Sequence, residues 1–212
     1  MEDGKIKKIN MLYLLGYIFG PMILIGLGGL IGYLFFKDGG TGAVIFFMCP
    51  TILAFLWWSF AGTLLFRFKV KAFEADLDSL GVSRNQTFYG RGKLVVLDLV
   101  TGQMGIVFFW NPFVSYLVPA TRVTKAWVDD GRMGKGFMEG SSRVRFLFVI
   151  DDIKVSVDTF TSNQRFRMDS DYILKGISKA DMMVQMIEEA KVVAIEKENK
   201  DKASKKEKKA KK

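Results

Sequence analysis

Few residues in this sequence have the types and spacing that enzyme chemistry requires. The chain of 212 residues contains no histidine and a single cysteine, Cys49. The lack of histidine excludes imidazole general bases, Ser–His and Cys–His pairs, and zinc sites that use imidazole. A single cysteine excludes an intrachain disulfide and a thiolate metal cluster. We therefore expect no enzyme activity, no cofactor and no metal site.

A glycine-rich segment at 131–140 has some features of a phosphate-binding loop. It lacks the Gly-Lys-Ser/Thr ending and the strand-to-helix context that such a loop needs. The pattern favours a mobile hairpin loop instead. In that loop, Arg132, Lys135, Phe137 and Met138 are candidates for contact with lipid headgroups or with a protein partner.

Two pairs of adjacent acidic residues, Asp129-Asp130 and Asp151-Asp152, have the chemistry for metal binding or acid–base catalysis. Adjacent residues on a strand point to opposite faces of a sheet, so neither pair converges on one ligand. Both pairs follow apolar segments with strand character, and Asp is common in turns because it forms local hydrogen bonds. The sequence therefore predicts turns at these positions.

The segment 197–212 concentrates positive charge. It holds nine lysines and three acidic residues, and so carries most of the net charge of +9. Such a segment buries too little apolar surface to fold alone, and we predict a disordered tail. Candidate contacts for anionic lipid headgroups are Lys205, Lys206, Lys208 and Lys209. Non-specific attraction to RNA and a solvated tail without a partner are the alternatives.

Two long uncharged stretches precede the rest of the chain. Residues 9–36 and 39–66 contain no charged side chain, and each exceeds the roughly 20 residues that cross a bilayer. The short glycine-rich connector predicts an antiparallel hairpin. Basic residues flank the hairpin on one side, at Lys5, Lys7, Lys8, Arg67, Lys69 and Lys71. The positive-inside rule then places both termini in the cytoplasm, as in a multi-pass protein of the cell membrane.

Small residues in the first stretch are spaced for close helix packing. Gly16 and Gly20 form one pair four residues apart, and Gly28 and Gly32 form another. Packing within the hairpin is the main interpretation, and homo-oligomerisation uses the same chemistry. Aromatic candidates for anchors at the membrane interface are Tyr13, Tyr17, Tyr33, Trp57 and Trp58, and helix packing is the alternative role.

The region after the hairpin predicts a mainly β domain. A juxtamembrane helix and linker occupy 67–86, with Gly81 ending the helix. Alternating apolar runs predict strands at 93–100, 103–110, 113–118, 122–129, 142–150 and 154–160. An apolar stripe at helical spacing predicts a helix from about 179 to 196. Phe146 and Ile187 are predicted to lie in the core.

This order of elements resembles the bacterial PH-domain membrane proteins, in which a membrane hairpin precedes a pleckstrin-homology-like barrel. The step Val118-Pro119-Ala120 before Thr121-Arg122-Val123 is similar to their apolar-proline step before a central strand. The resemblance covers about residues 10–190. It implies a sharply bent antiparallel barrel closed by a C-terminal helix, of mainly β, α+β class, and a scaffold or interaction module.

Taken together, the sequence predicts five regions. They are a cytoplasmic N-terminal tail at 1–8, a transmembrane hairpin at 9–66, the helix and linker at 67–86, a PH-like domain at 87–196 and the tail at 197–212. We expect a membrane-anchored scaffold or regulatory module whose PH-like barrel binds a protein or lipid partner. The alternative is a membrane-embedded accessory subunit or immunity factor that acts through its transmembrane helices.

Overall fold

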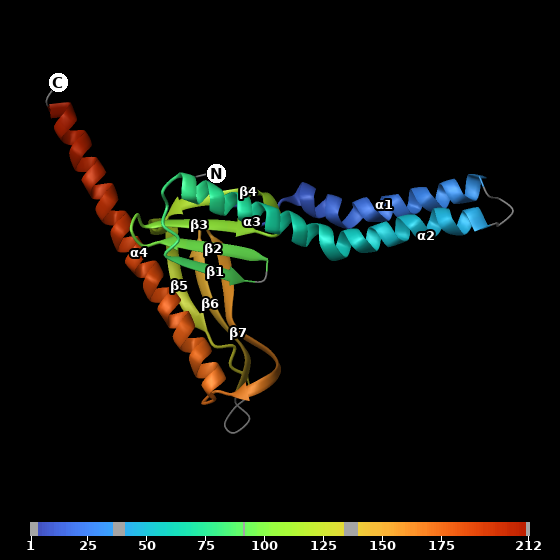
Figure 1. The fold of residues 1–212 in the computed structure, drawn as a ribbon. Coiled ribbons are helices and arrows are strands. Elements are labelled where there is room, and N and C mark those ends of the chain that lie inside the picture. The colour runs from blue at the N-terminus through green and yellow to red at the C-terminus, as the bar shows by residue number, and fades with distance from the viewer. Residues whose placement is uncertain (1–3, 36–40, 91, 134–139, 211–212) are drawn as a thin grey trace. The chain divides into compact units, whose positions relative to one another are not determined.

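The computed structural model describes residues 4–35, 41–90, 92–133 and 140–210, with the side chains at 43 and 205–210 outside that description (Figure 1). The contacts divide the chain into two compact units. The helical unit comprises Lys7–Ala72 and Phe108–Phe113. The sheet unit comprises Met1–Ile6, Phe73–Val107 and Val114–Lys212. Each unit is therefore assembled from segments that are distant in the sequence.

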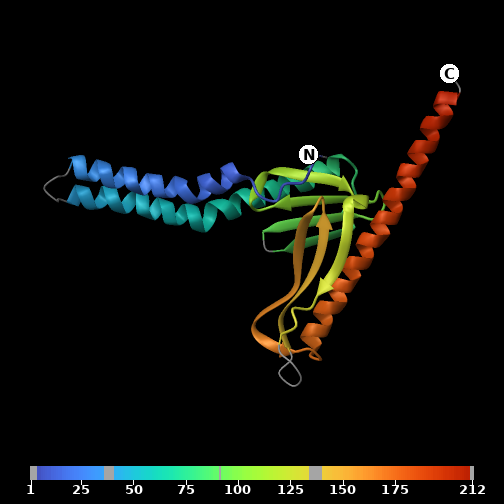
Figure 2. The same ribbon diagram turned by 180° about the vertical axis from the view of Figure 1, so that it is seen from behind.

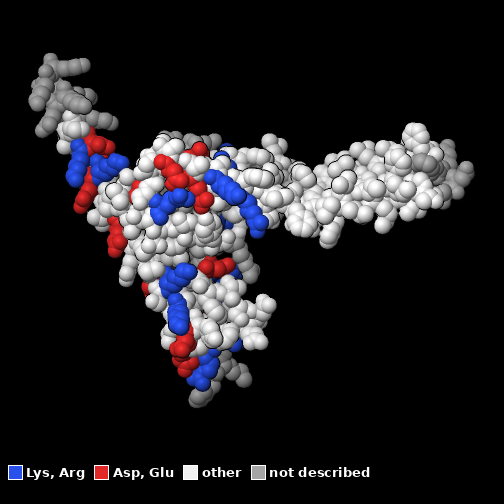
Figure 3. All heavy atoms as spheres, viewed as in Figure 1, with Lys and Arg blue, Asp and Glu red and all other residues white. Residues whose placement is uncertain are grey.

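Two stretches of the chain are long and apolar enough to cross a membrane, and both lie mostly in the helical unit. They are α1, Met11–Phe35, and the continuous helical stretch Val44–Ser79. The second stretch contains most of α2 (Thr41–Leu56), a π-helical turn η1 (Trp57–Ala61) and α3 (Gly62–Ser79). Helices α1 and α2 lie side by side (Figures 1 and 2), and their surface is almost free of charge (Figure 3). A helix that is apolar all round is typical of a membrane span.

Helix α3 ends where the sequence predicts. Gly81 has φ 65°, a left-handed conformation that glycine adopts without steric cost. The N–H of Val82 donates to the carbonyl of Leu77 at 3.0 Å, and the N–H of Gly81 donates to the carbonyl of Asp78 at 3.1 Å. These two bonds form a Schellman motif, which satisfies carbonyls at the helix end. Phe73 and Leu77 of this last part of α3 are fully buried in the sheet unit.

The first antiparallel sheet has four strands in the order of the sequence. They are β1 (Gln86–Gly90), β2 (Lys93–Asp98), β3 (Gln103–Phe108) and β4 (Asn111–Pro119). A short 3-10 helix, η2 (Ala120–Arg122), follows. The last three strands occur where the apolar runs predict them, whereas β1 was not predicted. That strand is five residues long and only Phe88 is buried, so it leaves a weak apolar pattern.

The second antiparallel sheet has three strands, β5 (Val123–Asp129), β6 (Gly140–Ile150) and β7 (Ile153–Arg167). The alternation predicted for β6 is present, because Val144, Phe146, Phe148 and Ile150 are all fully buried. Strand β7 extends seven residues beyond the predicted end at Phe160. Its last part is mostly exposed and polar, so pairing with β6 rather than apolar alternation makes it a strand.

Helix α4, Asp171–Ala210, runs along the second sheet (Figure 2). It begins about eight residues earlier than predicted and continues through the region predicted as a disordered tail. Extending an existing helix avoids the cost of nucleation, and Ala, Lys and Glu favour helix. The buried side of α4 consists of Ile173, Ala180, Met183, Ile187, Ala190 and Ala194. Ile187 is in the core as predicted, whereas the nearby apolar Met182 is 44% exposed.

Candidate functional site

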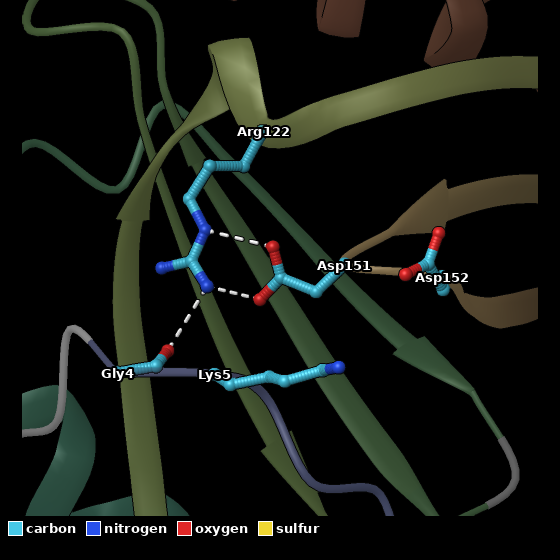
Figure 4. A pocket seen from close by; sticks show the side chains of 5 residues that line it. All are labelled: Gly4, Lys5, Arg122, Asp151 and Asp152. Atoms are coloured by element: carbon cyan, nitrogen blue, oxygen red, sulfur yellow. Dashed lines mark hydrogen bonds and ion pairs between the residues drawn. The ribbon is translucent and has the colours of Figure 1, made fainter.

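A small polar pocket of about 320 Å³ lies at the turn between β6 and β7, next to η2 (Figure 4). Asp151 and Asp152 form this two-residue turn and have φ of 49° and 68°. Positive φ at both central residues is typical of the type I′ hairpin, where Asp is tolerated. The second predicted acidic turn is therefore present. The other residues that line the pocket are Gly4, Lys5 and Arg122.

Arg122 and Asp151 form a two-pronged ion pair in this pocket. The Nε atom of Arg122 donates to Oδ1 of Asp151 at 3.0 Å, and Nη2 donates to Oδ2. Nη2 also donates to the carbonyl oxygen of Gly4 at 3.0 Å. The backbone N–H of Ile6 donates to Oδ2 of Asp151 at 3.2 Å. We call these four residues, Gly4, Ile6, Arg122 and Asp151, the N-terminal clamp.

The electrostatics of the clamp favour a charged carboxylate. Burial alone raises the pKa of Asp151, but the hydrogen bond from Arg122, the N–H of Ile6 and the charges of Arg122 and Lys5 outweigh it. The pKa of Asp151 is consequently lowered. Asp152, its neighbour in the turn, lies apart from the pair (Figure 4). The guanidinium of Arg122 is hydrogen-bonded to the carboxylate of Asp151 and to the carbonyl of Gly4, so its role is to link segments of the chain.

The clamp attaches the segment before α1 to the sheet unit. The side chain of Ile6 is 1% exposed, so this segment contributes to the core as well as to the pocket. Sequence reasoning missed the clamp because its parts come from distant positions, and Asp151 was identified only as a turn residue. The apolar Ile6 between basic residues was the available signal.

A second arrangement lies within the helical unit, where α1 meets the π-helical turn. The Oη of Tyr17 donates to the carbonyl oxygen of Trp58 at 2.6 Å. In return, Nε1 of Trp58 donates to the carbonyl oxygen of Tyr17 at 3.0 Å. A π-helical turn frees backbone carbonyls from their regular partners, and such turns occur often at functional positions.

The Phe108–Phe113 segment, which includes the end of β3 and the start of β4, adds three rings to this arrangement. Trp110 lies 5.7 Å from Tyr17, Phe109 lies 5.9 Å from Phe66, and Phe113 lies 5.5 Å from Tyr13, measured between ring centroids. The backbone is joined as well, since the N–H of Asn10 donates to the carbonyl of Trp110 at 2.9 Å. The aromatic collar, as we name it, comprises Tyr13, Tyr17, Trp58, Phe66, Phe109, Trp110 and Phe113.

Part of the collar was predicted from the sequence. Tyr13, Tyr17 and Trp58 were candidate anchors, whereas Phe109 and Trp110 were assigned only to a strand. The missed signal is the composition of the hairpin tip, because turns are usually polar and this one reads Phe-Phe-Trp-Asn-Pro-Phe. The other two candidate anchors, Tyr33 and Trp57, are 71% and 42% exposed.

The four glycines predicted for helix packing differ in their surroundings. A Cβ atom added at Gly28 would lie 2.7 Å from the carbonyl oxygen of Phe46 and would collide with the Pro50 ring. Gly28 and Gly32 are buried. Added Cβ atoms at Gly16 and Gly20 meet nothing within 4 Å. The first glycine pair therefore faces open space on α1.

The residues predicted to contact lipid or a partner are not brought together by the described structure. Arg132 pairs with Asp130 at 3.2 Å in the turn after β5. Lys135 and Phe137 lie outside the described residues. The backbone of α4 includes Lys205, Lys206, Lys208 and Lys209, whose side chains also lie outside the description. Among the side chains that are described, no group of three or more Cys, Asp or Glu is placed to hold a metal ion.

Comparison of the chain with protein-family models, with curated proteins and with solved structures found no match.

Proposed function

We propose that this chain is a membrane-anchored interaction module. In this proposal α1 and the stretch from α2 to α3 cross the membrane as a hairpin. The sheet unit is a cytoplasmic PH-like domain that binds a protein or lipid partner and thereby acts as a scaffold or regulator. The observation that carries the proposal is the N-terminal clamp, which joins the segment before the first span to the domain after the second.

The clamp constrains the topology of the proposed anchor. Ile6 is buried in the same unit as Phe73 and Leu77, which lie in the last part of α3, beyond the uncharged stretch 39–66. A folded unit lies on one side of a membrane, so the chain must cross and return between residues 6 and 73. Two apolar stretches in that interval fit a hairpin. The flanking lysines and arginines favour the cytoplasmic side.

The aromatic collar fits the same proposal. Tyr and Trp prefer the boundary between hydrocarbon and water because their rings are apolar and their Oη and Nε1 groups form hydrogen bonds. Tyr17 and Trp58 satisfy these groups with backbone carbonyls. In the proposed anchor, the collar lies at the cytoplasmic interface and fixes the depth of the hairpin.

The assignment of a PH-like fold rests on the order of the elements. An antiparallel sheet of four strands, another of three, and one long C-terminal helix follow each other along the chain, as in the pleckstrin-homology superfold. Because one fold hosts many functions, the fold supports an interaction module by analogy only. The resemblance to bacterial PH-domain membrane proteins supports the same role.

The alternative function acts through the spans, as an accessory subunit or immunity factor for another membrane protein. The open surface around Gly16 and Gly20 favours this alternative, since small residues let a second helix approach closely. A second copy of the chain uses the same surface if the protein forms a homo-oligomer.

Crosslinking in cells followed by mass spectrometry separates the two functions. The interaction module predicts partner crosslinks on the sheet unit, at 73–107 and 114–210. It also predicts that the Gly16→Leu, Gly20→Leu double variant keeps those crosslinks. Partner crosslinks confined to residues 11–66, and lost in the double variant, would support the alternative and overturn the module.

A further inference from the structure

We propose that the outer face of the second sheet binds an acidic, extended segment of a partner protein. The binding site is the lysine–tryptophan face, defined by Lys125 and Trp127 of β5 and Lys154 of β7. This inference rests on the proposed function, because it names the surface of the interaction module and the class of partner that it binds.

The strand register places these three side chains on one face. Lys125 of β5 pairs with Val149 of β6, and Val149 pairs with Lys154 of β7. The two lysines therefore stand in one row across the sheet, with Val149 between them. Trp127 stands two residues after Lys125 and therefore points to the same side. The opposite side of β6 carries the buried residues Phe146 and Phe148. The lysine–tryptophan face is thus the side away from Phe146 and Phe148, and on it Leu147, the register partner of Trp127, is buried.

Both lysines converge on one aromatic ring. The Nζ atom of Lys125 lies 5.2 Å from the centroid of the Trp127 ring, and the Nζ atom of Lys154 lies 5.1 Å from it. Each distance is within the range of a cation–π contact. Two ammonium groups near one indole repel each other, and an anion that binds to both relieves this repulsion.

The charge balance on this face is uneven. Beyond Trp127 along the sheet, Arg145 pairs with Asp129, and Arg143 donates two hydrogen bonds to Asp158 at 2.6 and 3.1 Å. Lys125 and Lys154 are exposed and form no ion pair with any acidic residue that the structure describes. The arginines on this face are therefore neutralised locally, whereas the two lysines are available to an outside anion.

The chemistry of the site favours carboxylates on an extended chain. Alternate residues of a strand lie about 7 Å apart and point the same way, so two Glu or Asp residues at i and i+2 supply one carboxylate to each lysine. Lysine acts as a point charge, whereas planar, two-pronged binding of phosphate is the strength of arginine. The two arginines of this face are already occupied by aspartates.

The test uses the full chain in nanodiscs of neutral lipid and a labelled decapeptide that alternates glutamate and serine. The readouts are peptide anisotropy and tryptophan emission. Three of the four tryptophans lie at 57, 58 and 110 in the helical unit, so Trp127 alone reports from the sheet unit. We expect an emission change on binding, and its loss in Trp127→Phe.

Charge variants then locate the binding. The double variant Lys125→Gln, Lys154→Gln should bind the peptide about fivefold more weakly or worse, since each exposed charge pair contributes modestly. The matched control Lys175→Gln, Lys179→Gln removes the same charge from exposed positions on α4 and should bind within about twofold of the parent, as expected for charges outside the site. The melting temperature of both variants should stay close to that of the parent, which separates binding from folding.

Three results would overturn the inference. Equal weakening by the two double variants would mean non-specific attraction, for example by the lysine-rich end of the chain. Unchanged emission would place peptide binding away from Trp127. An emission change in nanodiscs of anionic lipid, without peptide and dependent on Lys125 and Lys154, would assign the face to lipid headgroups. If partners crosslink to the sheet unit while the peptide fails, only this inference fails and the proposed function stands.

Discussion

Replacing Gly102 by alanine should destabilise the sheet unit more than any ordinary surface change. Gly102 ends the turn between β2 and β3 and has φ 68°, where an L-residue costs about 1–2 kcal/mol. An added Cβ atom would also lie 2.5 Å from the backbone nitrogen and 2.7 Å from the Cα atom of Ala194 in α4. These are backbone atoms, so relief requires α4 to shift as a whole.

The size of the effect follows from two contributions. Overpacking of a close contact typically costs about 1–3 kcal/mol, which adds to the strain at positive φ. We therefore expect Gly102→Ala to lower the free energy of unfolding by about 2–5 kcal/mol. The matched control is Gly81→Ala, because Gly81 has φ 65° and an added Cβ there meets nothing within 4 Å. The control should show the strain contribution alone, about 1–2 kcal/mol.

Pulse proteolysis of the full chain in detergent micelles, across a urea series, measures both variants. The difference between Gly102→Ala and Gly81→Ala isolates the contact with α4. If both variants lowered the free energy of unfolding by the same amount, the contact between α4 and the β2–β3 turn would be refuted.

Three further predictions concern the clamp, the hairpin and the lysine-rich segment. Asp151→Asn should destabilise the sheet unit at pH 7. Because the pKa of Asp151 is lowered in the folded chain, its contribution is full above the ordinary value of 3.8 and is lost as the pH falls below it. The difference between the parent and the variant in the free energy of unfolding, measured with urea, should therefore become smaller from pH 7 to pH 3. A difference that stays constant with pH would contradict the role of Asp151 in the clamp. Gly28→Leu should lower the thermal stability of the detergent-solubilised chain by forcing α1 from α2, whereas Gly16→Leu should not, and equal effects would refute this packing. A synthetic peptide of residues 197–212 should cosediment with anionic vesicles and detach at 1 M salt; equal binding to neutral vesicles would exclude electrostatic attraction.

The sequence predicted the elements with strong periodicity. The two apolar stretches, the end of α3 at Gly81 and the buried face of β6 are all present because each follows from a local pattern: length, a glycine stop, or alternation. Helix α4 was predicted from the sequence, but the predicted range of about 179–196 is shorter than the helix at both ends. Its lysine-rich end lacks the apolar stripe on which the prediction depended, whereas its first turns continue that stripe through Ile173 but contain Gly176, a weak helix former.

The sites were harder to predict than the elements. The clamp joins residues 4 and 6 to residues 122 and 151, and no local pattern signals a contact at that separation. Phe109 and Trp110 read as strand residues, because their apolar character fits a sheet as well as an interface. Lys125, Trp127 and Lys154 become one surface only through the register of three strands.

The central claim is that the segment before α1 and the sheet unit lie together on the cytoplasmic side of the membrane. Labelling of single cysteines in intact cells tests it most directly, in a Cys49→Ala background that removes the native thiol. The three positions are Lys5→Cys in the clamp pocket, Asp152→Cys at the β6–β7 turn, and Thr41→Cys at the start of α2. A membrane-impermeant maleimide should label Thr41→Cys in intact cells, and should label Lys5→Cys and Asp152→Cys only after permeabilisation. Labelling of Lys5→Cys in intact cells while Asp152→Cys stays protected would contradict the account, because it would place the two halves of the clamp on opposite sides of the membrane.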